Sequence, residues 1–214
     1  MWKMWFCIVI LLLIAGVFAE VERELHTFCI TRYKVLSPKW NGEKSGKIIF
    51  LSDLHNHEYG LHNKKLIDKI KKENPELILI GGDILVGKED ISYESATEFV
   101  EAICKIAPVY YANGNHEQRM KEKPEKYGNA FVGYKKRLLD AGVCFLENES
   151  VEVELGGNKL CLTGLELQLE VYEKMKTHKV TKEDVAQKVG SANREEIQIL
   201  LAHNPEYMEA YQAW

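Results

Sequence analysis

Hydrophobic residues in the middle of the chain fall in short runs that alternate with amphipathic stretches. The apolar runs at 48–51, 77–80 and 109–112 predict three buried strands. Between them, residues 63–73 and 92–106 place apolar side chains at helical spacing, with charged residues on the opposite face. Strands that alternate with helices in this way indicate parallel βαβ units, so we expect an α/β fold.

The flanking parts of the chain predict further elements. Before the first apolar run, residues 26–36 are rich in β-branched and aromatic residues and predict a strand, and 38–46 form a turn-rich connector. Beyond 112 we expect helices at 130–141 and from 206, and strands at 143–146, 151–155, 159–163 and 197–202. Gly156, Gly157 and Asn158 predict a hairpin turn between two of these strands. The charged, poorly patterned stretch 167–194 predicts surface loop and helix.

Residues 4–19 form the most hydrophobic part of the chain, with Lys3 before it and acidic residues after it. Two interpretations stay open: a retained membrane anchor, or a signal segment removed after Ala19 and followed by export. Lys3 favours a body outside the cytoplasm. We therefore divide the chain into a hydrophobic segment (1–19), an N-terminal strand and connector (20–46) and one folded domain (47–214).

Composition narrows the classes of function. The 214 residues carry 28 basic and 32 acidic side chains, a net charge of −4, and the two signs are interspersed. A protein that binds nucleic acid through a basic face is therefore not expected, because few phosphates would be neutralised. The five cysteines are scattered without a C-x-x-C pair, and we expect mostly buried free thiols. No signature of an oligomeric state is present.

Polar residues of metal-binding type follow four of the predicted strands. They are Asp53 and His55, then Asp83, then Asn115 and His116, and finally His203. The carboxyl ends of parallel strands share one sheet edge, where ligands of α/β proteins bind, so we expect these side chains to converge at one edge of one sheet. Asp53 and His55, two residues apart, would point the same way on an extended backbone. Carboxylate oxygens and imidazole nitrogens together suit a transition-metal ion.

The pattern D-x-H, G-D, G-N-H-E and a later H resembles the calcineurin-like metallophosphoesterase family, in particular its small membrane-associated bacterial branch. The resemblance covers about residue 48 to the end. It implies an αββα sandwich, with mixed sheets flanked by helices and a dinuclear metal centre at the sheet edge. It also implies two divalent ions of Mn, Fe or Zn.

Carried over to this sequence, the resemblance assigns five metal ligands. Asp53 and His55 would bind the first ion, Asp83 would bridge both, and the second ion would be held by Asn115 and His203. His116 would be the catalytic residue that acts on the phosphate and the leaving group without binding metal. The implied reaction is attack of metal-bound hydroxide on a phosphoester or pyrophosphate, without a covalent enzyme intermediate.

One departure from the family pattern is the absence of its last motif, G-H-x-H, before Trp214. We expect the chain to be a fragment that lacks the C-terminal strands, so the isolated chain can be inactive. A non-catalytic scaffold on the same fold and a nuclease of the same family are the alternatives. A membrane anchor favours a lipid-linked or cell-envelope phosphoester as substrate. His57 and His62 are expected on the loop after the first strand, and Glu117 at the start of a helix, where it would interact with the helix dipole.

Overall fold

The computed structural model describes residues 2–41, 44–173, 176 and 178–214. Its first sheet has four parallel strands in the order β1 (Ile48–Leu51), β2 (Leu77–Ile80), β3 (Val109–Tyr111) and β4 (Cys144–Phe145). The apolar runs predicted as strands form the first three of these. Their parallel pairing follows from the helices that connect them, which return the chain to the same end of the sheet each time.

A second sheet contains β5 (Ser150–Leu155), β6 (Asn158–Leu165) and β7 (Ile197–Ala202). β5 and β6 form the predicted antiparallel hairpin through Gly156 and Gly157, and β6 pairs with β7 in parallel. The prediction that all site residues lie at the edge of one sheet was therefore wrong, because His203 follows a strand of the second sheet. Hydrophobic periodicity identifies a strand but does not say which sheet the strand joins.

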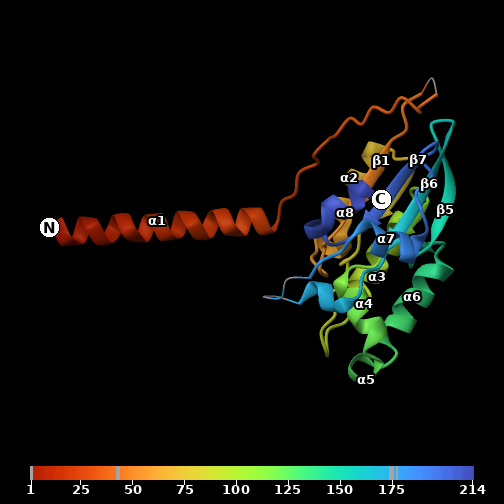
Figure 1. The fold of residues 1–214 in the computed structure, drawn as a ribbon. Coiled ribbons are helices and arrows are strands. Elements are labelled where there is room, and N and C mark those ends of the chain that lie inside the picture. Colours follow the sequence, from red (N-terminus) through yellow and green to blue (C-terminus); the bar gives the residue numbers. More distant parts are fainter. Residues whose placement is uncertain (1, 42–43, 174–175, 177) are drawn as a thin grey trace.

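Helices cover the outer face of each sheet (Figure 1). The first sheet is covered by α2 (Lys64–Glu73), α3 (Glu94–Ile103) and α6 (Ala130–Asp140), and the second by α7 (Lys182–Val189) and α8 (Met208–Ala213). Shorter helical segments lie in the connections: η1 (Leu61–Asn63), α4 (Asn115–Glu122), α5 (Pro124–Tyr127), η2 (Leu169–Tyr172) and η3 (Pro205–Tyr207).

The alternation of side chains along β2 shows how the layers are held together. Ile78 and Ile80 pack against the helices of the first sheet, whereas Leu77 and Leu79 pack between the two sheets, and all four are buried. The space between the sheets is filled from the other side by apolar residues of β5, β6 and β7. The result is the four-layer αββα sandwich that the resemblance implied, with one parallel sheet and one mixed sheet.

The hydrophobic N-terminal segment forms α1 (Trp2–Leu25), a single 24-residue helix that projects from the body (Figure 1). None of its residues is buried. By length and hydropathy α1 is able to cross a membrane, which is a property shared by membrane anchors and signal sequences.

The strand predicted at 26–36 is absent: residues 27–37 have no regular secondary structure. Tyr33, Val35 and Leu36 are more than 80% exposed, and no strand pairs with this segment in the described part of the chain. Strand propensity alone does not form a strand without a partner and a buried face. Met1, the connector at 42–43 and positions 174–175 and 177 of the predicted surface stretch lie outside the described residues.

Candidate metal centre

The loops that follow β1 and β2 are joined by backbone hydrogen bonds. The Asp53 N–H donates to the Gly82 carbonyl at 3.0 Å, and the His55 N–H to the Asp83 carbonyl at 3.0 Å. Asp53, His55 and Asp83 all have left-handed backbones, with φ values of 56°, 52° and 55°. The expected extended backbone from Asp53 to His55 was therefore wrong, because β1 ends at Leu51. Such strain in non-glycine residues is concentrated at functional sites.

Two glycines let the Asp83 turn and the start of α4 approach each other. Gly82 has a φ of 92°, and a Cβ atom there would lie 2.1 Å from the Gly114 nitrogen. A Cβ atom on Gly114 would lie 2.2 Å from Oδ1 of Asp83. Neither separation is compatible with a side chain, so both glycines are needed for this contact.

Asp83 lies at the centre of the site, with its side chain 3% exposed. Its Oδ1 accepts from the His116 backbone N–H at 2.8 Å. Its Oδ2 lies 3.2 Å from Nε2 of His55, and the corresponding distances to Nε2 of His203 and His116 are 3.3 Å and 3.8 Å. Three imidazoles, two from loops and one from the first turn of α4, therefore surround one carboxylate oxygen.

The side chains form two groups that each have ligand atoms close enough for one ion. One group consists of Asp53, Asp83 and His203, and the other of His55, Asp83 and His116. Each residue offers one ligand atom, and the ligand atoms of a group lie within 4.8 Å of one another. Asp83 belongs to both groups. The pairing of the other residues differs from the one that the resemblance implied, which placed Asp53 with His55 and did not count His116 as a ligand. Asn115, the remaining predicted ligand, is the first residue of α4 and lies between Gly114 and His116. Asp53 also accepts a hydrogen bond from the Ser52 hydroxyl.

His116 and His203 differ in the hydrogen bond that their Nδ1 atoms make. Nδ1 of His116 accepts from the Gly87 N–H at 2.9 Å, so its neutral ring carries the proton on Nε2. Nδ1 of His203 faces the Gly81 carbonyl at 2.8 Å and must donate, which leaves Nε2 free to bind a cation when the ring is neutral. The arrangement of His203, in which Nδ1 donates to a carbonyl and Nε2 stays free, is the usual one for a metal-binding histidine.

Asp83 and His203 each shift the pKa of the other. Burial alone would raise the pKa of Asp83, but hydrogen bonds from His203 and from the His116 N–H lower it to about 2. Burial alone would lower the pKa of His203, but the Asp83 carboxylate raises it to about 9. Without a metal ion the two groups therefore form a carboxylate–imidazolium pair at neutral pH. Burial lowers the pKa of His116.

Glu117 contributes more than the helix-dipole interaction expected from the sequence. It is fully buried, and its carboxylate accepts hydrogen bonds from the Asp83, Ile84 and Gly114 N–H groups at 2.8–3.0 Å. The Tyr111 hydroxyl donates to it at 2.7 Å. Burial and the charge of Asp83 raise the pKa of Glu117. Glu117 thus connects the Asp83 turn to α4 from inside the protein.

Other residues near the site are placed as follows. His57 and His62 lie on the loop after β1, as expected, and bond outside the centre, to the Leu25 carbonyl and to Glu98. Tyr172, which the sequence did not indicate, lies with its ring centroid 6.1 Å from that of His203. Its stretch of sequence lacks any periodic pattern, so only a spatial contact identifies it.

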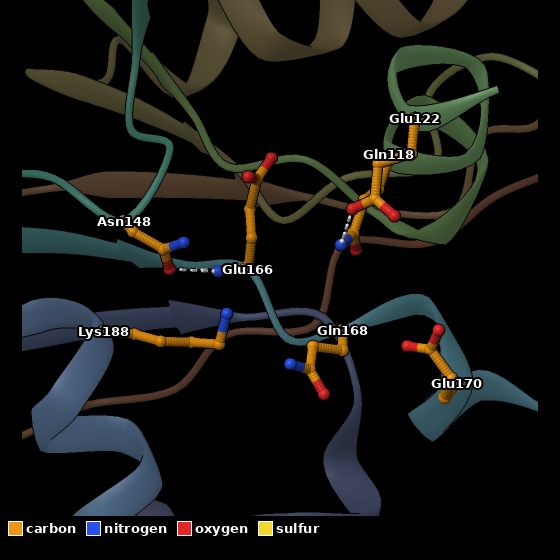
Figure 2. Close-up of a pocket in the computed structure, with 7 residues that line it drawn as sticks. All are labelled: Gln118, Glu122, Asn148, Glu166, Gln168, Glu170 and Lys188. Atoms are coloured by element: carbon orange, nitrogen blue, oxygen red, sulfur yellow. Dashed lines mark hydrogen bonds between the residues drawn. The ribbon is translucent and has the colours of Figure 1, made fainter. Parts of the chain in front are cut away.

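A polar cavity of about 320 Å³ lies beside α4 (Figure 2). It is lined by Gln118, Glu122, Asn148, Glu166, Gln168, Glu170 and Lys188. None of these residues belongs to the two groups around Asp83. Gln118 and Glu122 bond to each other at 2.7 Å, and the Glu166 N–H donates to Asn148 at 2.8 Å. The cavity is therefore separate from the candidate metal centre.

Comparison with known proteins finds distant relatives of this chain. The chain is 23% identical over 188 residues to the uncharacterized protein YpbG of Bacillus subtilis, covering 86% of this chain and 60% of that protein. It is 26% identical over 121 residues to the phosphodiesterase YaeI of Escherichia coli, covering 55% of this chain and 42% of YaeI. The chain thus spans 60% or less of the length of these two relatives.

Among solved structures, phosphopantetheinyl hydrolase (PptH) from Mycobacterium tuberculosis aligns with a TM-score of 0.40 at 14% identity, covering 79% of this chain and 61% of that one. No conclusion about this chain is drawn from this structural similarity. The family model of calcineurin-like phosphoesterases matches residues 46–214, which include every residue of the two groups around Asp83. This protein is therefore a member of the calcineurin-like phosphoesterase family.

Proposed function

We propose that this protein hydrolyses a phosphoester or pyrophosphate bond with the help of two divalent metal ions bound around Asp83. Family membership and the convergence of carboxylates and imidazoles support a phosphoesterase-type function. The observation that carries the proposal furthest is the position of Asp83, which belongs to both groups of candidate ligands. A carboxylate has two oxygens and is suited to a place between two cations.

The donor set fits a transition metal. Oxygen ligands from Asp53 and Asp83, the Asn115 amide and the imidazoles of His55 and His203 suit Mn, Fe or Zn. Three imidazoles around one carboxylate oxygen would repel one another if all were protonated, and a bound cation removes the need for those protons. When bound, such ions neutralise phosphoryl charge and lower the pKa of water.

His116 has the role of a hydrogen-bond donor to the reacting phosphate in this proposal. Its Nδ1 accepts from the Gly87 N–H, so the neutral ring presents an N–H at Nε2, toward the centre. That N–H can donate a hydrogen bond to a phosphoryl oxygen or to the oxygen of the departing alcohol, and so stabilise the negative charge that develops when the P–O bond breaks. The hydrogen bond from Gly87 makes His116 less suited than His203 to hold a metal ion. This supports the division of roles that the family resemblance implies.

We further propose that α1 is retained and anchors the body to a membrane, with removal after Ala19 as the alternative. Fractionation of cells, followed by the intact mass of the membrane-bound protein, distinguishes the two outcomes. The scaffold alternative is weakened by the group of polar side chains around Asp83, since a binding module has no need of strained backbones at Asp53, His55 and Asp83.

The test of the hydrolase proposal uses the full chain in detergent with added Mn²⁺, Fe²⁺ or Zn²⁺. We expect hydrolysis of bis(p-nitrophenyl) phosphate that is abolished by a chelator and restored by one of these ions. His62→Ala serves as a control because His62 lies on the exposed loop and pairs with Glu98. A chain that binds the ions but hydrolyses no phosphoester or pyrophosphate would support the scaffold alternative instead.

A further inference from the structure

The end of α1 is held against the loop that carries His55. Nε2 of His57 donates to the carbonyl oxygen of Leu25, the last residue of the helix, at 2.6 Å. His57 is two residues from the candidate ligand His55. The junction between the hydrophobic helix and the body therefore lies beside the candidate metal centre.

The junction is short and well packed. His26 and Thr27 extend the helix end, because the Thr27 hydroxyl donates to the Arg23 carbonyl at 2.8 Å and the His26 ring bonds to the Glu22 carbonyl. The next residue, Phe28, packs on the core of the body, with its ring centroid 4.9 Å from that of Tyr59. Only two residues thus separate the helix from the folded body, and the body has little freedom to turn.

This spacing sets how far the loop lies from a bilayer spanned by α1. The apolar run ends at Ala19, and the six residues to Leu25 rise by about 9 Å in a helix. The headgroup layer on each side of a bilayer is about 5–8 Å thick. Leu25, and with it the loop at 54–63, would therefore lie at the outer boundary of the headgroups.

The loop at 54–63 and the start of α2 carry side chains that suit a position at the surface of the headgroups. Leu61, at the start of η1, is 79% exposed. Lys65, four residues later, is exposed and has no acidic partner among the described residues. An apolar side chain beside an unpaired lysine is suited to the surface of a membrane with anionic lipids.

The candidate metal centre is open on the side of this same loop. The side chains of Asp53 and His55 are 57% and 43% exposed, whereas those of Asp83 and His203 are 3% and 8% exposed. A substrate therefore reaches the centre from the side on which Asp53 and His55 lie. An open approach of this kind suits a phosphate group that stays attached to a larger body, such as a lipid.

We propose that the centre faces the bilayer and that its substrate is a phosphoester in the headgroup of a membrane lipid. The proposal rests on the hydrolase function proposed above. In the reaction, the oxygen of water bonds to phosphorus, the P–O bond to one alcohol breaks, and that alcohol leaves with a proton. The lipid phosphate stays in the membrane plane, at the height that the Leu25–His57 contact gives the centre.

The test compares two substrates that share one leaving group. Full-length protein, reconstituted in vesicles of phosphatidylcholine and phosphatidylglycerol and loaded with metal, is given phosphatidyl-p-nitrophenol in the bilayer or soluble bis(p-nitrophenyl) phosphate. A Gly–Ser spacer of about 12 residues inserted between Thr27 and Phe28 lets the body move by about 20 Å. A matched control carries the same spacer after Ser191, in the exposed loop before β7.

We expect the spacer after Thr27 to lower turnover of the lipid by about tenfold while turnover of the soluble ester is unchanged, and the control spacer to change neither. As a readout independent of turnover, Leu61→p-benzoylphenylalanine should cross-link to lipid on illumination, whereas the same residue at Val132, exposed on the distant α6, should not (Figure 1).

The outcomes separate the two proposals. If neither ester is hydrolysed, the proposed function fails, and the lipid substrate fails with it. If the soluble ester alone is hydrolysed, or the spacer after Thr27 leaves lipid turnover unchanged, the hydrolase stands and the membrane-facing centre is wrong. Equal cross-linking from positions 61 and 132 would also overturn the membrane-facing orientation.

Discussion

His116 and His203 face the same oxygen of Asp83, yet their Nδ1 atoms make opposite hydrogen bonds. His116 accepts from the Gly87 N–H, and His203 donates to the Gly81 carbonyl. In the neutral state the two rings therefore present different atoms toward Asp83: an N–H from His116 and a lone pair from His203. One site thus contains a histidine suited to donate a hydrogen bond to the substrate and another suited to bind a metal ion.

This difference predicts different losses on substitution. His116→Asn should lower kcat for bis(p-nitrophenyl) phosphate by about 10²–10³-fold and leave the metal content unchanged, since only a hydrogen-bond donor to the reacting phosphate is removed. His203→Ala should lower the metal content itself. Steady-state kinetics and elemental analysis of the same samples distinguish these results. Loss of metal from His116→Asn would show that His116 is a ligand.

Replacement of Glu117 should destabilise the protein and weaken metal binding together. In Glu117→Ala three buried N–H groups lose their acceptor, at about 1–3 kcal/mol per group, so the free energy of unfolding should fall by at least about 3 kcal/mol. Chemical denaturation measures this loss. Glu125→Ala, at an exposed position of α5, should change stability by less than about 0.5 kcal/mol. Similar stability of both variants would contradict the role given to Glu117.

Gly114→Ala should disrupt the site because the added Cβ atom would lie 2.2 Å from Oδ1 of Asp83. The Asp83 turn and the start of α4 would have to separate, so we expect loss of metal affinity, measured by calorimetric titration. Gly16→Ala is the control, since its Cβ atom would have no neighbour within 4 Å. Unchanged affinity in Gly114→Ala would show that the close approach is not needed.

The stability of the metal-free protein should depend on pH through Asp83 and His203. The pKa of His203 is raised to about 9 from an ordinary value near 6.5, so its contribution is complete below about pH 6.5 and is lost as the pH rises through 9. The pKa of Asp83 is lowered to about 2, so its contribution is complete above about pH 4 and is lost as the pH falls toward 2.

Thermal unfolding with chelator present, measured across this pH range, tests both directions. In His203→Gln the decline in Tm between pH 6.5 and 9 should be reduced, while the decline at acid pH is kept in part. If His203→Gln retains the full decline at alkaline pH, another group is responsible.

The sequence predicted most of the strands and the convergence of Asp53, His55, Asp83, His116 and His203, because apolar runs and polar strand ends are local signals. It did not predict that His203 comes from a second sheet, since periodicity says nothing about the partner of a strand. Residues 26–36 have strand propensity but form no strand, since no described strand pairs with them. The burial of Glu117 and the position of Tyr172 depend on contacts between distant segments, so no local pattern contains them.

The most direct test of the central claim is the metal content of the full chain and of Asp83→Asn. The amide keeps an oxygen that can accept from the His116 N–H but removes the charge shared by both ligand groups. Asp68→Asn, an exposed carboxylate on α2, is the control. We predict that wild type and Asp68→Asn bind about two transition-metal ions per chain, and that Asp83→Asn loses them. Equal metal content in all three proteins would contradict a metal centre at Asp83.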